Sequence, residues 1–526
     1  MDNKPKIMAA KIISIKEFEK HNKSDDAWII IDGDVFNVTK FAGLHPGGEQ
    51  ILLEYAGQDC TDVFFGLHRN EVLVKYAPRL VVGRIEGAEA RNSENKIQTR
   101  DEISKIPYAE PSAWQGFASP FFNESHIKYR SQMRKFLCEN ILESAEQGEI
   151  DGISPTDEIF SIMGQNGLLA ARIGPGEHLR FAPKMIGDVP VEKFDYFHEM
   201  IAHEEIARLA CPGYVDGLGS GMCIGLPPVL QFGPEWMKEK VGHEVLTGKK
   251  RICLAITEAF AGSDVANLKT TAVKSADGSH YIVNGTKKWI TNGHDSHYFV
   301  TLCRTGGAGM GGLSFLLVER GPGLETKKIK TSYSPAAGTA YITYENVKVP
   351  AGNLIGFENA GFLHAMYNFN HERWMIICYI VAGCRGMLEE CFKWANQRQA
   401  FGKPLLHQPV IRQKLARMVA ETESVYSWLL NLTYQMTILP YDEQSEKLAG
   451  TMSLVKYQST RCAQMISDEA VQIFGGRGIT AGGQGKFVER FMRTNKFAAI
   501  LGGSEEIMAD LGIKLAMKDI PANAKL

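Results

Sequence analysis

The chain has 526 residues, 44% of them hydrophobic, and its 58 lysines and arginines nearly balance its 60 aspartates and glutamates. A chain of this length exceeds one hydrophobic core, so three or four domains are expected, and its near-neutral charge argues against a nucleic-acid or anionic-membrane partner. Its ten cysteines include no C-x-x-C pair and are interpreted as buried thiols, and no apolar run reaches the roughly 18 residues that span a bilayer.

Residues 10–86 are predicted to form one small α+β domain. An apolar run, an Asp-Gly turn and an alternating stretch predict a β-hairpin over Trp28–Val38. A His-Pro-Gly-Gly sequence starts at His45, and an apolar helical run over Ile51–Gly57 leads on to His68. Two neutral imidazoles can clamp a haem iron from both faces, and the glycines let the backbone approach the macrocycle. Either histidine alone would be interpreted as a hydrogen-bonded surface residue.

The sequences W-x-x-x-x-G, V-x-N-V-T-x-F and H-P-G-G, followed by a later histidine, together resemble the cytochrome b5 family over this whole segment. The resemblance implies a b-type haem with His45 and His68 as axial ligands. Such an iron has no open position, so it should carry electrons and not bind oxygen. The stretch between the ligands is one residue shorter than is usual in that family. We expect the loop before His68 to absorb the difference.

Residues 87–115 are polar and charged and are predicted to be a linker. Residues 116–250 show mostly helical periodicity. The stretch Gly217–Gly225 is rich in glycine but lacks the G-x-G-x-x-G spacing of a dinucleotide-binding loop, which argues against a Rossmann dehydrogenase. We interpret it as close helix packing near a ligand. One expected helix opens with the stretch Phe121–Arg130, and the others are Phe160–Ala171 and Phe194–Leu209.

Residues 251–360 are expected to form an antiparallel β-domain between two helical ones, because turns such as Asp277-Gly278 and Asn284-Gly285 separate short alternating runs. After Gly361 the helical period returns and holds to Lys518, so residues 361–526 are expected to form a C-terminal helical domain. The expected strands are Ile252–Ile256, Tyr281–Val283, Lys288–Ile290, Tyr298–Leu302, Ser314–Val318 and Ala340–Tyr344.

Several short stretches suit a flat, redox-active ring. A tryptophan can cover a ring face, a threonine can bond a ring nitrogen, an arginine can neutralise a pyrophosphate, and glycines permit close backbone approach. Each stretch alone would be interpreted as strand core, a turn or a solvated helix. The stretches are Thr257–Asp264 (TEAFAGSD), Lys288–Gly293 (KWITNG), Arg398–Pro404 (RQAFGKP) and Gln472–Gly476 (QIFGG).

Together and in this order, these stretches resemble the acyl-CoA dehydrogenase family from about Phe117 to the C-terminus. The resemblance implies FAD bound at a dimer interface, in a homodimer or homotetramer. Residues near 257–291 would serve the protomer's own flavin, whereas those from Arg398 to Gly476 would reach the flavin of the neighbouring protomer. The flavin-binding residues that the resemblance implies are Thr257, Ser263, Trp289, Ile290, Thr291, Arg398, Phe401, Gln408, Gln472, Gly475, Gly476 and Ser504.

Two stretches depart from the family pattern. Ala259-Phe260 replaces the proline and small residue of the usual T-E-P-x-A-G-S-D, which is expected to reshape the pocket entrance. Ser332–Thr339 replaces the usual M-G-x-R-x-S-D-T segment.

The dehydrogenation needs a carboxylate base beside the α-carbon of the substrate, and burial suits such a base because it raises the pKa. Many family members keep the base in an E-G-[TS] segment near the C-terminus, where this chain has Gly502. Members that resemble the long-chain and isovaleryl enzymes place it instead in an x-E-R segment, which His371-Glu372-Arg373 matches. The resemblance therefore predicts Glu372 as the base. Glu505 and Glu506 are the other candidates, and a surface Glu372 in an inactive enzyme is the alternative.

The remaining substrate contacts follow from the same resemblance. The backbone N–H of Gly502 would polarise the thioester carbonyl, as in an oxyanion hole. Ser263, Asn370 and Arg373 are expected to line the substrate site. A base at this helix favours a long or branched acyl chain.

The expected activity is FAD-dependent α,β-dehydrogenation of an acyl-CoA thioester in fatty acid β-oxidation. The fusion suggests that electrons pass from the flavin to the haem and then to an outside acceptor. An acyl-CoA oxidase that releases peroxide, and a haem carrier with an inactive flavin domain, stay open as alternatives. A nitroalkane-oxidising relative would need an aspartate where Gly502 stands. The C-terminal Ala524-Lys525-Leu526 resembles the S-K-L peroxisomal address, so a peroxisomal location is expected.

Overall fold

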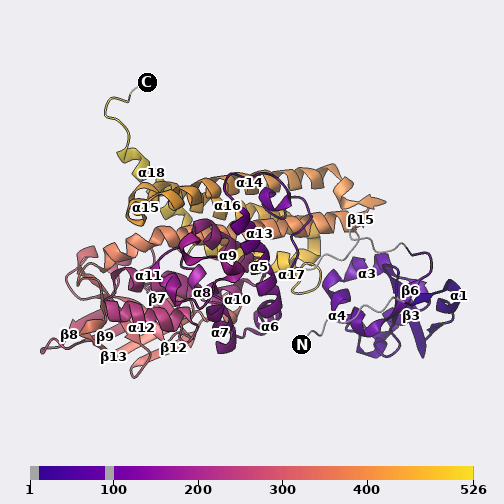
Figure 1. Ribbon diagram of the computed structural model, residues 1–526, viewed down its shortest axis with the longest axis horizontal. Helices are drawn as coiled ribbons and strands as arrows, with labels where there is room; N and C mark the ends of the chain where they lie inside the picture. The colour runs from indigo at the N-terminus through magenta and orange to yellow at the C-terminus, as the bar shows by residue number, and fades with distance from the viewer. Residues whose placement is uncertain (1–10, 89–99, 525–526) are drawn as a thin grey trace. The chain divides into compact units, whose positions relative to one another are not determined.

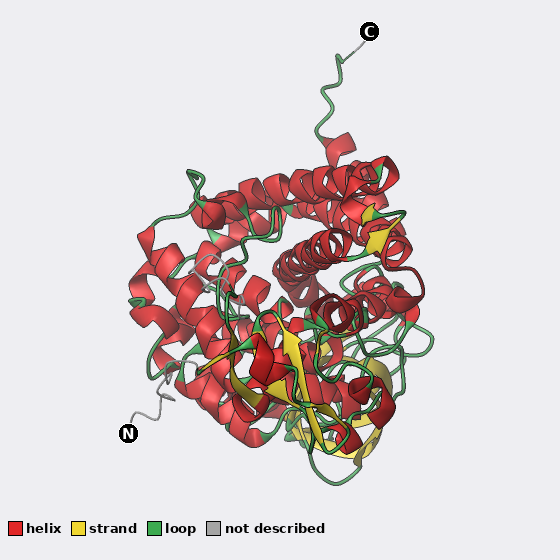
Figure 2. Ribbon diagram, turned by 90° about the vertical axis from the view of Figure 1, so that its right-hand side faces the viewer, coloured by secondary structure: helices red, strands yellow, loops and turns green. Residues whose placement is uncertain are grey.

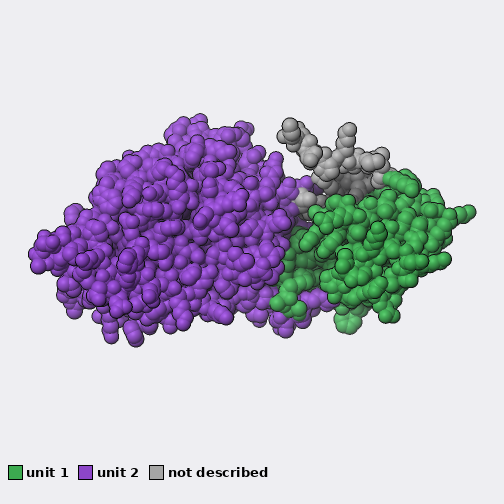
Figure 3. Space-filling view, turned by 90° about the horizontal axis from the view of Figure 1, so that it is seen from below, with its two compact units in different colours: residues 1–99, 393–408, 480–486 green, residues 100–392, 409–479, 487–526 purple. Residues whose placement is uncertain are grey.

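The computed structural model describes residues 11–88 and 100–524. The chain divides into two compact units, coloured separately in Figure 3. The first comprises residues 1–99, 393–408 and 480–486, and the second comprises residues 100–392, 409–479 and 487–526. Two residues of the expected peroxisomal address, Lys525 and Leu526, lie outside the described residues. No helix among those described is both long and apolar enough to cross a bilayer.

The N-terminal domain is a small sheet with short helices on it, as expected (Figure 1). Its strand order is β1-β6-β4-β3-β2, and β5 pairs with β3. The predicted hairpin is present: β3 and β4 pair antiparallel around Asp32-Gly33, whose φ values of 53° and 75° suit a tight hairpin turn. The elements are β1 Ile12–Ile13, α1 Ile15–Phe18, β2 Asn22–Lys23, β3 Asp26–Ile31, β4 Asp34–Asn37, α2 Glu49–Leu53, β5 Gln58–Asp59, α3 Thr61–Leu67, α4 Asn70–Leu80 and β6 Val81–Ile85.

The predicted linker over residues 87–115 does not hold beyond residue 99, because the second unit begins at Arg100. Glu110, only 1% exposed, anchors this stretch in a cluster of buried arginines. Arg134 donates to its carboxylate at 2.7 Å, Arg130 at 3.1 Å, and Arg208 pairs with it at 3.2 Å. Burial alone would raise the pKa of Glu110, but the three guanidinium charges hold it well below the usual value.

Replacing Glu110 with glutamine is expected to destabilise the second unit by roughly 3–5 kcal/mol, because the buried Arg130 and Arg134 and the partly exposed Arg208 would lose their shared counter-charge. Denaturant unfolding of the variant measures this loss. The matched control is Glu139→Gln, which breaks a 3.8 Å pair with Lys135 whose side chains are both 59% exposed. That change is expected to cost less than about 1 kcal/mol. Equal effects of the two variants would contradict a structural role for the buried cluster.

The N-terminal part of the second unit is helical. One expected helix, Phe160–Ala171, is instead two: α7 ends at Gln165, and Gly167 adopts φ 72° before α8 starts. A left-handed glycine ends a helix readily, which the periodicity did not reveal. The helices are α5 Glu124–Asn140, α6 Leu142–Asp151, α7 Asp157–Gln165, α8 Leu168–Ala171, α9 Tyr196–Ala207, α10 Pro212–Gly217, α11 Ser220–Phe232 and α12 Glu235–Leu246.

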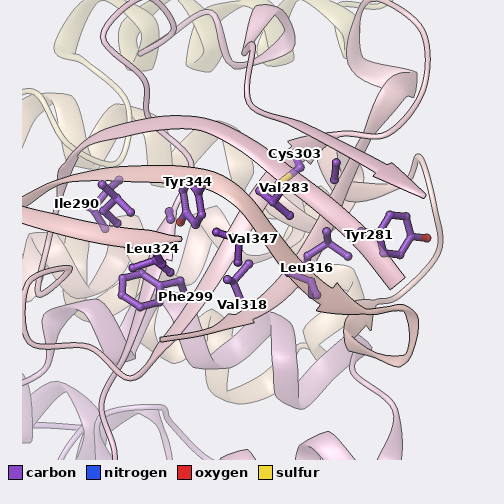
Figure 4. Close-up of a cluster of buried hydrophobic side chains, with 14 of the residues drawn as sticks. Tyr281, Val283, Ile290, Phe299, Cys303, Leu316, Val318, Leu324, Tyr344 and Val347 are labelled. Carbon is purple, nitrogen blue, oxygen red and sulfur yellow. The ribbon is translucent and has the colours of Figure 1, made fainter. Parts of the chain in front are cut away.

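The middle β-domain is one sheet in the order β12-β13-β9-β8-β10-β11-β14, with β7 beside β10. Most neighbours are antiparallel, but β7 and β8 run parallel to β10. Its buried cluster includes Tyr281, Phe299 and Tyr344 (Figure 4). The strands are β7 Ile252–Ala255, β8 Thr271–Lys274, β9 His280–Ile290, β10 Tyr298–Arg304, β11 Leu313–Glu319, β12 Leu324–Lys328, β13 Ala340–Pro350 and β14 Leu354–Ile355.

The turn expected at Asn284-Gly285 is wrong, because β9 runs straight through it and pairs with β8 and β13. Glycine at position 285 allows Thr270 to approach the strand closely. A Cβ atom at this position would lie 2.6 Å from Oγ1 of Thr270. The Asn-Gly pair therefore marks crowded strand packing and not a hairpin.

The C-terminal part is a bundle in which long helices dominate (Figure 2). Helix α16 packs against α14 and α18. A two-stranded hairpin, β15 Gln399–Ala400 and β16 Lys403–Pro404, follows the first long helix. The helices are α13 Gly361–Gln397, α14 Pro409–Ile438, α15 Tyr441–Lys447, α16 Ala449–Phe474, α17 Lys486–Ala498 and α18 Glu505–Lys518.

Candidate active site and haem site

The proposed base, Glu372, lies on α13 and is only 7% exposed. Its Oε2 atom is buried and has no hydrogen-bond partner among the described residues. Burial raises the pKa of Glu372 to about 7, although the charges of Arg373, Lys456 and His371 pull in the opposite direction. A buried carboxylate with a free oxygen and a pKa near neutrality is suited to accept a proton.

Gly502 lies next to Glu372 in space. In the chain, 129 positions separate Gly502 from Arg373, the residue after Glu372. It precedes α18 with φ 66°, which favours glycine. A Cβ atom at this position would lie 3.7 Å from Oε1 of Glu372 and 2.7 Å from Cδ1 of Ile376. The carboxylate from α13 thus lies beside the space that a side chain at position 502 would enter. The two positions at which the resembled family places its base, those of Glu372 and Gly502 in this chain, therefore lie side by side.

Arg373 and Asn370 join this cluster. Nε of Arg373 donates to the carbonyl of Gly502 at 3.0 Å, and Nη1 donates to Oδ1 of Asn370 at 3.2 Å. The amide of Asn370 donates in turn to the carbonyl of Ser445. Burial lowers the pKa of Arg373, whereas the charge of Glu372 raises it. Arg373 therefore fixes the Gly502 turn relative to the base.

The flavin-binding stretches of the β-domain are also brought together. The backbone N–H of Lys288 donates to the carbonyl of Thr257 at 2.8 Å, which joins the first two stretches. Trp289 has φ 59° and is 48% exposed, so its ring can face a ligand. Oδ1 of Asn292 accepts from the backbone of Gly221 at the start of α11. The Gly-rich stretch therefore does pack closely beside the predicted flavin site.

The other residues predicted to bind the flavin or the substrate differ in their exposure and in their hydrogen bonds. Thr291 is partly exposed and Ser263 is exposed, as a ligand contact requires. Ile290 is 3% exposed in the sheet core, so only its backbone can reach a ligand. The hydroxyl of Ser504 caps α18, where it accepts from the backbone of Ile507 at 3.5 Å.

The stretches expected to serve a neighbouring flavin are exposed. Phe401, at the tip of the β15–β16 hairpin, is 94% exposed with φ 52°. Arg398 precedes this hairpin and Gln408 follows it. Gln472 lies near the end of α16, and a Cβ atom at Gly475 or Gly476 would meet nothing within 4 Å. Their role toward a second protomer stays a prediction.

Sequence reasoning missed a buried ion pair beneath the flavin stretches. Nζ of Lys287, on the buried face of β9, lies 2.9 Å from Oε1 of Glu258 and donates to the carbonyls of Ile256 and Leu302. Glu258 also accepts from the backbone of Lys269 and Thr270. The signal was available, because a lysine in phase with the apolar positions of a strand needs a buried partner. This pair shapes the turn that carries Ser263.

The two expected haem ligands face each other in the N-terminal domain. The ring centroids of His45 and His68 are 5.8 Å apart. Nδ1 of His45 donates to the carbonyl of Gly48 at 3.1 Å, which leaves Nε2 bare for a metal. Burial is the main cause that lowers the pKa of His68, so that its imidazole stays neutral, as an iron ligand must be.

The surroundings of these histidines also fit a haem. A Cβ atom at Gly47 would lie 2.8 Å from Cε1 of His45, so glycine is needed beside the ring. Phe64 stacks on His68 with centroids 4.7 Å apart. The shortened stretch between the ligands is not absorbed by a loop directly before His68, because α3 runs without interruption to Leu67. The regular helix instead holds His68 at its C-terminal end.

Four family models match successive segments of the chain. A cytochrome b5-like haem/steroid-binding domain matches residues 14–86. The N-terminal, middle and C-terminal domains of acyl-CoA dehydrogenases match residues 123–249, 253–347 and 359–516.

Individual proteins that this chain resembles are also named acyl-CoA dehydrogenases. Acyl-CoA dehydrogenase apdG of Emericella nidulans is 41% identical over 81% of this chain and 98% of its own length. Acyl-CoA dehydrogenase AFT10-1 of Alternaria alternata is 36% identical over 79% and 97%. A solved acyl-CoA dehydrogenase from Bacillus anthracis, complexed with FAD, is 28% identical with a TM-score of 0.65 over 76% of this chain and 69% of its own.

Proposed function

Because this chain belongs to the acyl-CoA dehydrogenase family and carries a cytochrome b5-like domain before it, we propose that it dehydrogenates an acyl-CoA thioester with Glu372 as the base. The observation that supports this most directly is the buried Glu372 carboxylate, with one free oxygen, beside Gly502. A glycine cannot abstract a proton, so the base must come from another element. The carboxylate of Glu372 adjoins this position, because a Cβ atom placed at Gly502 would lie 3.7 Å from its Oε1.

The residues of the chain have separate tasks in this proposal. Glu372 accepts the α-proton, and the backbone N–H of Gly502 polarises the thioester carbonyl. Arg373 holds the Gly502 turn through its 3.0 Å hydrogen bond. Trp289 and Thr291 would hold FAD, which would supply the hydride acceptor for the dehydrogenation. Ser263, Asn370 and Arg373 line the substrate site, and the base position favours a long or branched acyl chain.

The fused domain suggests where the electrons go. His45 and His68 would hold a b-type haem, which transfers single electrons. We propose that a haem held there would supply a one-electron carrier between the reduced flavin and an outside acceptor. An oxidase that uses oxygen directly is the second candidate, and a haem carrier with an inactive flavin domain is the third.

An anaerobic absorption titration of the purified full chain with a long-chain acyl-CoA tests these candidates. Bleaching of the flavin, followed by the spectrum of reduced haem, is the expected result. Bleaching without haem reduction would remove the internal route and leave the dehydrogenation. Absence of bleaching with long-chain and branched substrates would contradict the dehydrogenation itself. Stoichiometric peroxide on admission of oxygen, with the haem still oxidised, would favour the oxidase.

Assembly and location belong to the same proposal. The exposed Phe401 hairpin and the open Gly475-Gly476 turn support a homodimer or homotetramer in which each protomer completes its neighbour's flavin site. The C-terminal address supports a peroxisomal enzyme of fatty acid β-oxidation.

A further inference from the structure

A lysine on α16, Lys456, is completely buried next to the Glu372 cluster. Its Nζ donates to the carbonyl of Gly503 at 2.5 Å. A buried ammonium loses its hydration, so a lysine with no exposed surface needs strong compensation from its surroundings. Here the one hydrogen bond found among the described residues is to a neutral carbonyl, which leaves most of the compensation to nearby charges.

Those charges come from two helices. Glu372 on α13 and Glu505 and Glu506 on α18 supply negative charge that favours the ammonium form of Lys456, whereas the positive charge of Arg373 on α13 opposes it. Glu505 lies near two other cations, Lys496 at 3.5 Å and Arg461 at 3.7 Å, whose side chains are 58% and 52% exposed. Glu506 lies at the surface. Glu372 and Glu505 are thus the two buried carboxylates near Lys456, and Glu372 is the one that has no ion-pair partner within 4 Å among the described residues.

The two buried cations of the site hold successive carbonyls. Arg373 bonds the carbonyl of Gly502, and Lys456 bonds the carbonyl of Gly503. Both glycines adopt positive φ, 66° and 102°, so this turn lacks side chains that could fix it. The turn is thus held from two sides by side chains that also surround the base.

We propose that Lys456 is a positioning residue for the dehydrogenation, which fixes the Gly502-Gly503 turn and supplies a positive charge that favours the ionised form of Glu372. This inference rests on the proposed function, since it assumes that Glu372 is the base. Burial lowers the pKa of Lys456 to about 8, so the lysine still carries its charge where Glu372 titrates, at about 7. Burial acts to lower the pKa of His371, but the charge and hydrogen bond of Glu199 raise it overall.

The sign of the expected effect follows from Coulomb's law. Loss of the positive charge at position 456 makes the carboxylate of Glu372 less stable relative to its protonated form. The acidic limb of the pH profile of kcat/KM should therefore move to higher pH. A shift on the order of one pH unit is expected when a nearby opposite charge is removed from a buried carboxylate.

Three variants of the full-length holoenzyme separate the two roles. Lys456→Met removes charge and donor, Lys456→Gln removes the charge and keeps a donor, and Lys456→Arg keeps both. The limb should shift in the Met and Gln variants and stay in place in the Arg variant. The matched control is Lys496→Met, which removes a solvent-screened charge whose side chain is 58% exposed and should leave the limb in place. FAD content and melting temperature are recorded for every variant.

An unshifted limb in Lys456→Gln would overturn the proposal, even if that variant loses stability, because a merely structural lysine would not move the limb. If Lys456→Met does not fold, the Gln and Arg variants decide the question between them. The proposed function fails differently: an active Glu372→Gln enzyme would exclude Glu372 as the base whatever the Lys456 variants show.

Discussion

Replacing Glu372 with glutamine is expected to slow reduction of the flavin by acyl-CoA by about 10³-fold, within the range for loss of a general base. Glutamine has nearly the same shape but cannot take the α-proton, and the carboxylate it replaces is 7% exposed with a free oxygen. Anaerobic stopped-flow absorption at saturating substrate measures the rate. FAD content and melting temperature should match those of the natural chain, so that the loss belongs to the proton transfer.

The control for this substitution is Glu506→Gln, a carboxylate near the same turn. Hydrogen bonds from its own backbone and from Ser504 lower the pKa of Glu506, which makes it a weak base. It should keep its rate within about twofold, well below the loss expected for a general base. Inactivation by Glu506→Gln, with full activity in Glu372→Gln, would place the base at the C-terminal segment after all.

The pH dependence of the natural enzyme tests the proposed base independently of its rate loss on substitution. The base must be ionised to act, and its pKa is raised to about 7. The value of kcat/KM should therefore fall as the pH drops below about 7, roughly tenfold for each unit. In Glu372→Gln, the residual activity should lose this limb.

Features that depend on motifs of a few chemically specific residues, or on their resemblance to a family pattern, could be predicted from the sequence. The Asp32-Gly33 hairpin, the facing histidines and the pairing of Glu372 with Gly502 each depend on a few residues whose chemistry is specific. The proximity of Glu372 and Gly502 was predictable only because two observations met: one motif lacked its carboxylate and another supplied it.

Features that depend on burial could not be read from the sequence in the same way. The stretch around Glu110 has the composition of a linker, yet three arginines from α5 and the end of α9 make it part of the core. Asn284-Gly285 has a strong turn signal, but the packing of Thr270 overrides it. Local preference is weak compared with tertiary contacts of this kind.

Substitution of His68 by alanine is expected to remove most of the bound haem, because the iron would lose one of two axial ligands in a site whose faces are set by His45 and His68. Purified protein should lose the absorption of a six-coordinate b-type haem and the pyridine-haemochrome signal. His21→Ala is the matched control, since His21 lies in the same domain but stacks on Trp28 at 3.5 Å and pairs with Asp26. Equal haem loss in both variants would mean that general destabilisation, and not ligation, explains the result.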